Sequence, residues 1–217
     1  MDTRSKIIVA AIGIMTSISI GSLLLYQQPQ RHGIIPTFEK TKIPPLMMEG
    51  GDPHIRALMR MISASESNDR QPYSVLYGGS HVVDLSRHPE KCIRIVNGPN
   101  MNNCSTAAGR YQMINTTWGM MAKKYHPNPD KVLWMNTGGY SFHPEYQDAV
   151  VHAWLSDEKF WGMNISQLLK DGELTQVRKR LSSTWTSLGY GIENNTMTPE
   201  LPRIYERLIR EELVRKS

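Results

Sequence analysis

Hydrophobic residues recur at helical spacing in several stretches of the chain. The first begins at Asp52-Pro53, where an aspartate suited to capping a helix precedes a proline suited to its first turn. The apolar positions that follow at this spacing define one buried helix face each. They are Ile55, Leu58, Met59 and Ile62; Trp118, Met121, Ala122 and Tyr125; Ala149, Val150, Ala153 and Trp154 after Pro144; Leu174, Val177, Leu181 and Trp185 before Gly189; and Ile204 and Leu208 after a Thr198-Pro199-Glu200 cap.

A different pattern, rich in β-forming residues, runs from Tyr73 to about Asp84 around Gly78-Gly79. We expect a hairpin or an irregular β-lobe there. The next segment, which holds Cys92 and Cys104, reads as loop. The predicted fold class is therefore α+β, mainly α, with a small β-lobe.

An uncharged apolar segment lies near the start of the chain. Residues 7–26 carry no charged side chain and follow Arg4 and Lys6. About twenty apolar residues suffice for a helix to cross a hydrocarbon core of roughly 30 Å, and no small-residue cleavage site ends the stretch.

We therefore expect residues 1–26 to form a signal-anchor or transmembrane helix in the inner membrane, with the rest exported to the periplasm or cell envelope. Cleavage of the segment would instead release a secreted protein. The proline-rich and glycine-containing residues 27–51 read as a linker, and residues 52–217 as the folded domain.

The composition is that of a globular protein with a modest basic excess. Hydrophobic residues make up 40% and charged residues 21%, and the net charge is +5. A positive charge favours anionic partners, but no recognition-helix or RNA-platform pattern accompanies the scattered basic residues. We expect no nucleic-acid partner, and we expect a monomer.

The two cysteines point to a disulfide. An exported location permits a bond between Cys92 and Cys104, and closing a loop of this size stabilises a fold by roughly 3 kcal/mol. Two cysteines without a C-x-x-C pair do not make a zinc site by themselves, and the seven histidines lack an H-E-x-x-H spacing. We expect no metal and no cofactor.

A carboxylate, Glu66, continues the apolar face of the first predicted helix by one more turn. Desolvation and the negative end of the helix dipole both disfavour its charged form there. A carboxylic acid that keeps its proton is what protonating a glycosidic oxygen requires. The alternative is that the helix has ended and Glu66 turns outward into solvent.

A series of short motifs accompanies Glu66 in a fixed order. They are SASESND at 63–69, YSVLYGG at 73–79, DLSRHP at 84–89, TAAGRYQ at 106–112, YQDA at 146–149 and WTSLGYG at 185–191. This series resembles the lambda-phage endolysin type of lytic transglycosylase, in the lysozyme-like superfamily, over roughly Asp52 to Lys216. Several motifs in one order are more specific than any one alone. The resemblance implies a lysozyme-like fold with a glycan cleft between its lobes, acting on peptidoglycan glycan strands without a cofactor.

The resemblance also implies residue roles. The glutamate of the family's Ser-Glu-Gly motif is the catalytic acid/base and matches Glu66, although Ser67 stands here in place of the glycine. Serine enters positive φ less readily than glycine, which affects the local turn. The family's Gly-Arg-Tyr-Gln segment lines the cleft and is intact here. The candidate substrate-binding residues are Arg110, Tyr111 and Gln112 from that segment, with Tyr73 and Asp84 from the neighbouring motifs.

The implied reaction cleaves the bond between N-acetylmuramic acid and N-acetylglucosamine. Glu66 first donates a proton and then, as a carboxylate, assists attack by the sugar's own 6-hydroxyl, which leaves a 1,6-anhydromuramoyl end. One alternative is a muramidase in which Asp69 or Asp84 assists a water, although capping a turn or holding the lobe through Arg87 or His88 suits these aspartates better. The other alternative is a membrane-anchored, non-catalytic wall-binding module.

Overall fold

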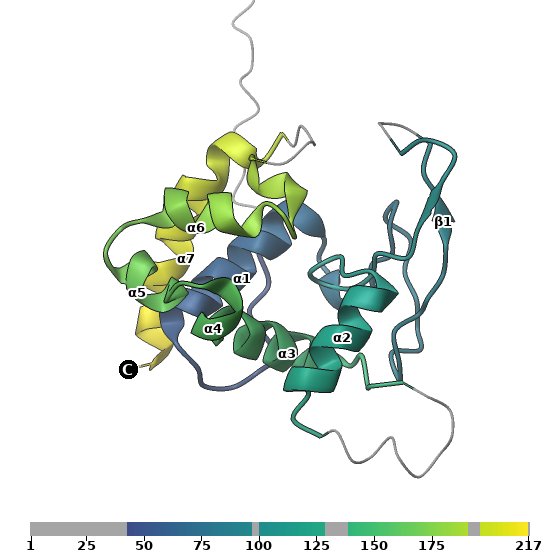
Figure 1. The fold of residues 1–217 in the computed structure, drawn as a ribbon, viewed down its shortest axis with the longest axis horizontal. Coiled ribbons are helices and arrows are strands. Elements are labelled where there is room, and N and C mark those ends of the chain that lie inside the picture. The colour runs from purple at the N-terminus through teal and green to yellow at the C-terminus, as the bar shows by residue number, and fades with distance from the viewer. Residues whose placement is uncertain (1–42, 97–99, 129–138, 191–195, 217) are drawn as a thin grey trace, which may run out of the picture. The chain divides into compact units, whose positions relative to one another are not determined.

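The computed structural model describes residues 43–96, 100–128, 139–190 and 196–216 (Figure 1). Residues 40–217 form one compact unit. The predicted membrane segment 7–26 lies outside the described residues. Within the described ranges, no helix has the length and apolar character needed to cross a membrane.

The unit is built mainly from helices, with the first long helix α1 in its core. The helices are α1 (Pro53–Glu66), α2 (Asn115–Tyr125), α3 (Pro144–Ser156), α4 (Glu158–Trp161), α5 (Ile165–Lys170), α6 (Leu174–Leu181) and α7 (Leu201–Lys216). Short 3-10 helices cover η1 (Pro72–Ser74), η3 (Thr186–Leu188) and η4 (Thr198–Glu200). α1 packs against α7, α3 and α5, so most of its circumference is covered.

The start of α1 follows the sequence prediction. The Asp52 side chain accepts hydrogen bonds from the backbone N–H groups of His54 and Ile55, and Pro53 occupies the first turn. The apolar face of α1 is fully buried, as are most of its other side chains. A helix this deeply buried holds its last residue, Glu66, in a fixed place.

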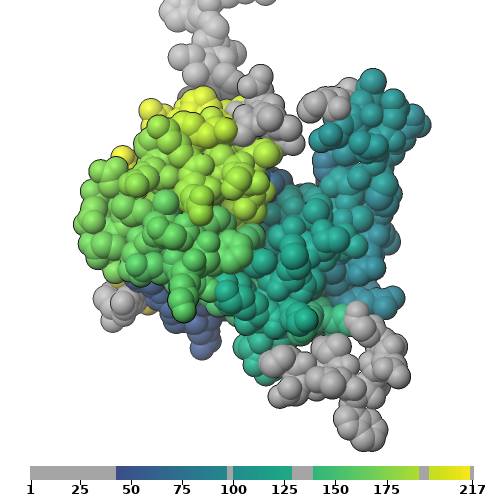
Figure 2. All heavy atoms as spheres, viewed as in Figure 1, coloured from purple at the N-terminus to yellow at the C-terminus, as the bar shows by residue number. Residues whose placement is uncertain are grey.

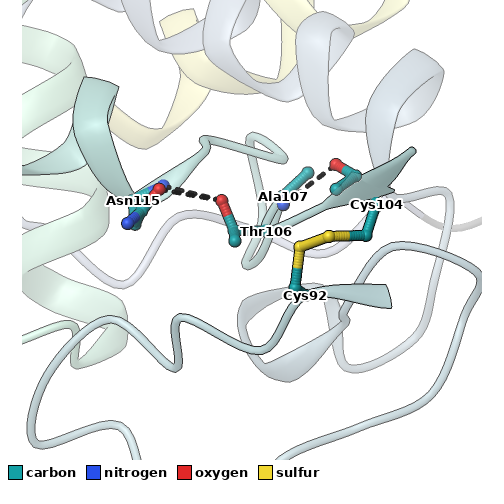
Figure 3. The surroundings of a disulfide bond; sticks show 6 residues. Cys92, Cys104, Thr106, Ala107 and Asn115 are labelled. Carbon is teal, nitrogen blue, oxygen red and sulfur yellow. Dashed lines mark hydrogen bonds between the residues drawn. A yellow bond between two sulfur atoms is a disulfide. The ribbon is translucent and has the colours of Figure 1, made fainter. Parts of the chain in front are cut away.

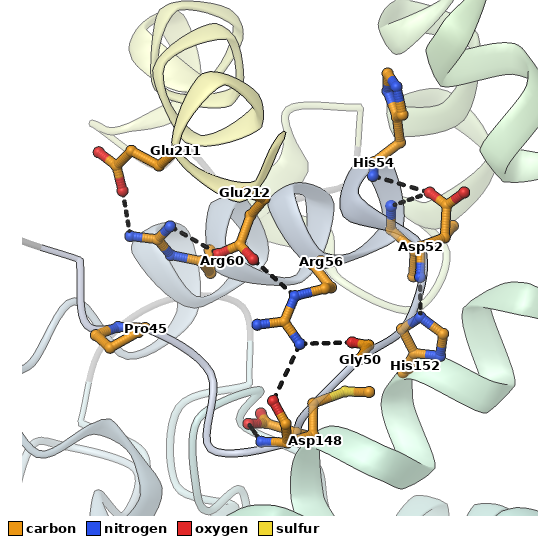
Figure 4. A network of polar contacts seen from close by, with 12 residues as sticks. Pro45, Gly50, Asp52, His54, Arg56, Arg60, Asp148, His152, Glu211 and Glu212 are labelled. Carbon is orange, nitrogen blue, oxygen red and sulfur yellow. Dashed lines mark hydrogen bonds and ion pairs between the residues drawn. The ribbon is translucent and has the colours of Figure 1, made fainter. Parts of the chain in front are cut away.

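Two buried arginines join α1 to α7. The side chains of Arg56 and Arg60 both reach the fully buried carboxylate of Glu212, at 2.7 and 2.9 Å. Arg60 also bonds the more exposed Glu211 at 2.7 Å. Figure 4 shows the two arginines on α1 and both glutamates on the neighbouring helix. Because the charges are paired, the polar contact between these helices is compatible with burial.

The small sheet lies in the cysteine segment. Strands β1 (Ile93–Arg94) and β2 (Cys104–Ser105) pair antiparallel, with Ile93 opposite Ser105. The predicted disulfide is confirmed: Cys92 and Cys104 are bonded, with 5.3 Å between their Cα atoms (Figure 3). The hairpin predicted near Gly78-Gly79 is reduced to a single bridge, Val75 to His81. The other alternative, an irregular β-lobe, fits the segment, since Leu76 also bridges Ala108. The two-residue strands β1 and β2 are too short to produce an alternating pattern in the sequence.

The segment 43–51, assigned to the linker on sequence grounds, belongs to the compact unit. Ile43 and Leu46 are buried in the hydrophobic core. The backbone of the segment is held as well, since Arg60 donates to the Ile43 carbonyl at 2.9 Å and Asp148 accepts from Met47 N at 2.6 Å. Residues 43–51 therefore pack with the compact unit. Their prolines and glycines give no helical or strand pattern in the sequence that would indicate this packing.

Candidate functional site

Glu66 is the last residue of α1 and is half-buried. The chain turns immediately after it. Ser67 has φ −105°, and the positive φ value of the turn, 36°, falls on Asn68. The backbone N–H groups of Ser67 and Asn68 both donate to the Ser63 carbonyl at 3.0 Å. Serine therefore fits at position 67 without strain, because asparagine tolerates the left-handed conformation at the next position.

The carboxyl group of Glu66 contacts a serine from a distant part of the chain. Oε1 of Glu66 accepts a hydrogen bond from the hydroxyl of Ser187, a buried residue of η3 that lies 121 residues later. The Ser187 hydroxyl also lies 3.0 Å from Oγ of Ser65, which in turn donates to the Ile62 carbonyl at 3.0 Å. The Glu66 carboxyl group is thus bonded to segment 186–188 on one side and remains partly exposed to solvent.

Ser187 lies in the WTSLGYG motif, but the sequence alone indicates no role for it. A lone serine carries no periodic or spacing signal. The relation between Ser187 and Glu66 depends on how η3 packs against the end of α1. The one available indication was that Ser187 lies inside a motif that matches the family.

Arg110 and Tyr111 lie inside the protein. Their exposed fractions are 0% and 1%. The Arg110 guanidinium donates to the Pro44 and Pro45 carbonyls at 2.6 and 2.9 Å and to the Tyr73 hydroxyl at 2.9 Å. These contacts hold the backbone at Pro44 and Pro45 in place. Because neither side chain is exposed, their position gives no support to the predicted contact of Arg110 and Tyr111 with substrate.

Tyr73 joins the same network through Asp148 of α3. The Tyr73 and Tyr111 hydroxyls donate to the two oxygens of the Asp148 carboxylate. Burial, followed by the charge of Asp148, raises the pKa of both tyrosines above the usual value. Both hydroxyl groups therefore stay protonated and act as hydrogen-bond donors. Tyr73 is only partly buried, and its hydroxyl links Arg110 to Asp148 within the fold.

Gln112 has an unusual backbone and a side chain that stabilises its own loop. Its φ is 45°, in the left-handed region that few non-glycine residues adopt. The side-chain amide donates to the carbonyls of Val75 and Gly109 at 3.2 and 3.0 Å. Of the three residues of this segment predicted to bind substrate, Gln112 lines a pocket, whereas Arg110 and Tyr111 are buried.

That pocket has a volume of about 390 Å³ and lies between α2 and the chain after α6. Its walls combine exposed apolar side chains, among them Met120 and Phe160, with polar groups such as Gln112 and Thr184. Figure 2 shows the teal segment around residues 112–121 lying against the green surface of the later helices. Trp185 lines this pocket two residues before Ser187, so the pocket adjoins the chain segment that contacts Glu66.

The two aspartates considered as second acids both bond to their own turns. Asp69 accepts from the Gln71 N–H at 2.6 Å and lies 3.4 Å from Nε2 of His81. Asp84 is exposed and accepts from the Ser86 N–H at 2.9 Å. Hydrogen bonds from Ser86 lower the pKa of Asp84, so it is ionised at neutral pH.

His88 does not hold Asp84. Its ring is buried, Nε2 lies 2.9 Å from the Met113 carbonyl, and Nδ1 accepts from the Glu90 N–H at 3.2 Å. Burial lowers the pKa of His88, consistent with a neutral ring that donates from Nε2. Among the described residues, no group of three or more histidine, cysteine or acidic side chains is arranged to bind a metal.

Known proteins share the sequence family and the fold of this chain. A family model for endolysins matches residues 56–208. The endolysin of Escherichia phage lambda is 30% identical over 146 residues, which cover 63% of this chain and 79% of the phage protein. Bacteriophage lambda lysozyme complexed with a chitohexasaccharide matches with a TM-score of 0.53 and 26% identity, over 75% of this chain and 97% of that one. A second lambda lysozyme structure, 24% identical with a TM-score of 0.51, shares the fold. The predicted lysozyme-like fold is confirmed.

Proposed function

The chain belongs to the endolysin family, whose enzymes act on peptidoglycan, and from this premise we propose that it is a lytic transglycosylase with Glu66 as its acid/base. The reaction cleaves the β-1,4 bond between N-acetylmuramic acid and N-acetylglucosamine. The glycan strands of peptidoglycan are the substrate.

One observation carries the proposal: the carboxyl group of Glu66 stands at the end of a buried helix and is held there by the Ser187 hydroxyl. A general acid must be fixed in place and partly shielded from water, so that its proton goes to the substrate. Glu66 meets both conditions. The outward-turned, fully solvated glutamate considered on sequence grounds does not match this position.

The chemistry needs a single carboxyl group. Glu66 donates its proton to the glycosidic oxygen as the bond to the anomeric carbon breaks. The resulting carboxylate then takes the proton of the muramoyl 6-hydroxyl while that oxygen bonds the same carbon. The bond broken is replaced by an intramolecular ether, Glu66 regains its proton, and water is not consumed.

The contacts of Asp69 and Asp84 favour this route over hydrolysis. A muramidase needs a second carboxylate to act as nucleophile or to activate water. Asp69 and Asp84 are each engaged by a backbone N–H two residues later. Turn capping is the role that the sequence suggested for Asp69, and Asp84 makes the same kind of bond in place of the predicted contact with His88.

We place the glycan in the pocket beside residues 183–185, whose walls carry both apolar and polar side chains. Sugar rings present both apolar faces and hydroxyl groups, and the pocket walls offer partners for each. Lambda lysozyme binds a chitohexasaccharide, a chain of amino sugars. We further propose that the N-terminal residues 1–26 anchor the exported domain at the inner membrane, where peptidoglycan is within reach.

The proposal is tested by Glu66→Gln. Glutamine keeps the size of the side chain and its contact with Ser187 but has no transferable carboxyl proton. Release of soluble fragments from purified peptidoglycan is expected to fall at least about 1,000-fold, with sedimentation of the protein on peptidoglycan unchanged.

The matched control is Glu206→Gln, which removes an exposed glutamate on α7 and is expected to keep full activity. If wild-type protein binds peptidoglycan but releases no fragments at any pH, the chain is a binding module. If Glu66→Gln cleaves as well as Glu206→Gln does, Glu66 is not the acid.

A further inference from the structure

Ser187 and Ser65 place two buried hydroxyl groups in line behind the carboxyl group of Glu66. Their exposed fractions are 3% and 8%. The line runs from Glu66 Oε1 to the Ser187 hydroxyl, then 3.0 Å to Ser65 Oγ, and a further 3.0 Å to the Ile62 carbonyl. It ends on a backbone oxygen of α1 itself.

We propose that Ser187 is a positioning residue for Glu66, and that its hydroxyl reverses its hydrogen bond, between Glu66 and Ser65, as Glu66 loses and regains its proton. The inference rests on the proposed function, because it concerns how the same carboxyl group serves as acid and then as base. It assigns a role to a serine that no sequence pattern singled out.

The hydrogen count supports a reversible line. A hydroxyl has one hydrogen, so Ser187 cannot donate to Glu66 and Ser65 at the same time, although both acceptors lie within reach. When Glu66 is a carboxylate, Ser187 donates to Oε1. When Glu66 is protonated and no substrate accepts its proton, its O–H forms a hydrogen bond to Ser187 Oγ, the Ser187 hydrogen turns to Ser65, and Ser65 still donates to the Ile62 carbonyl. Every hydrogen has an acceptor in both states.

Other side chains would favour one state. An amide or guanidinium donor stabilises the carboxylate and lowers the pKa of a carboxyl group, so that less of it carries the proton that an acid catalyst needs. A carbonyl acceptor does the opposite. A hydroxyl both donates and accepts, which suits a residue that must be acid and base within one turnover.

Ser187 is itself fixed by its neighbours. Its carbonyl accepts from the Thr198 hydroxyl at 3.0 Å. The next carbonyl, that of Leu188, accepts from both Nε and a terminal nitrogen of the buried Arg178, at 3.1 and 2.8 Å. These bonds fix the backbone at residues 187 and 188, so the Ser187 hydroxyl stays in contact with Glu66 through the reaction.

The test compares Ser187→Ala with Ser182→Ala. Ser182 is a matched control, because it is equally buried but its hydroxyl donates to the Arg178 carbonyl, at 2.7 Å, rather than to Glu66. With soluble glycan strands as substrate, kcat of Ser187→Ala is expected to fall about 10- to 100-fold, the value of a hydrogen bond to a charged group. KM is expected to stay within about twofold, and Ser182→Ala to match wild type.

The pH profile separates positioning from packing. Loss of the Ser187 donor disfavours the Glu66 carboxylate, so the alkaline limb of kcat is expected to move to higher pH in Ser187→Ala and to return in Ser187→Thr, which restores the hydroxyl. Ser65→Ala is expected to have a smaller effect that disappears in the Ser187→Ala background, because both act through one line.

The proposal is overturned if the alkaline limb of Ser187→Ala coincides with that of Ser182→Ala, whatever the loss of rate. Glu66→Gln is measured beside these variants. Full activity of Glu66→Gln would refute the proposed function itself, whereas an inactive Glu66→Gln with an unchanged Ser187→Ala would refute the serine line alone.

Discussion

At the scale of single residues, Gly109 is a position where the structure leaves no room for a side chain. Its φ is 74°, and a Cβ atom there would overlap Oε1 of Gln147 and lie 2.7 Å from the Phe142 ring. Gln147 is fully buried and accepts the Arg110 N–H at 2.9 Å. Glycine at this turn therefore keeps the segment 109–112 docked on α3.

Gly109→Ala is expected to lower the free energy of unfolding by about 2 to 4 kcal/mol, from the left-handed backbone and the overlap with Gln147. Chemical denaturation measures the change. Gly119→Ala is the matched control, because Gly119 lies within α2 with open space around it, and alanine there should stabilise by up to about 1 kcal/mol. Equal effects of the two substitutions would contradict this account.

Asp157 gives a pH-dependent prediction. Lys124, at 2.7 Å, and then the Tyr125 hydroxyl and Phe160 N–H hold the pKa of Asp157 well below its usual value. The folded state therefore binds this proton less tightly than the unfolded state. The resulting stabilisation is complete above the unfolded-state pKa of about 3.9 and is lost as the pH falls through the folded-state pKa.

Asp157→Asn should therefore be less stable than wild type at neutral pH, with a difference in Tm that shrinks from about pH 5 downward. Thermal unfolding across this range checks it. Lys124→Met removes the largest cause and should reduce the pH-dependent difference. A difference in Tm that stays constant down to pH 2 would show that the carboxylate contributes nothing through its charge.

The sequence was informative about Glu66 and uninformative about its surroundings. Glu66 stood out because the apolar face of one helix led to it. Arg110 and Tyr111 were assigned to the cleft because they share a motif, yet their side chains turn inward to Asp148 and the segment 43–48. The direction of a side chain in a loop depends on contacts distant in sequence, which a local pattern does not contain.

At the scale of elements, the contact between α1 and α7 determines how firmly Glu66 is held. Glu212 pairs with Arg56 and Arg60 and is fully buried, whereas Glu211 pairs with Arg60 and is 45% exposed. Removing one partner of a buried pair leaves unpaired charge inside the protein. An exposed pair contributes little.

Glu212→Gln is therefore expected to cost about 3 to 5 kcal/mol of the free energy of unfolding, and the neighbouring Glu211→Gln about 1 kcal/mol or less. Urea denaturation of the two variants provides the comparison. If Glu211→Gln proves as damaging as Glu212→Gln, burial does not set the value of these ion pairs.

Long elements were predictable and short ones were not. α1, α2, α3 and α7 each span enough turns for an apolar face to repeat. α4 and α5, with four and six residues, are too short for that. The stripe predicted from Leu174 to Trp185 breaks at Leu181, and Trp185 reaches the core from the following turn, with its indole N–H on the Tyr111 carbonyl at 3.0 Å.

At the scale of the whole molecule, the fold class followed from the helical pattern and the motif series, while the extent of the domain did not. Ile43 and Leu46 are isolated apolar residues among prolines, and their burial depends on packing against core residues distant in sequence. The disulfide was predictable because its two cysteines are the only ones in the sequence. The predicted membrane segment lies outside the described residues.

The central claim is that one carboxyl group cleaves the glycan without water, and mass spectrometry of digested peptidoglycan tests it most directly. The account predicts muropeptides that end in 1,6-anhydromuramic acid, each lighter by one water molecule than the hydrolytic product, and none from Glu66→Gln. Reducing muramic acid ends from the wild-type enzyme would contradict it and would identify a hydrolytic muramidase instead.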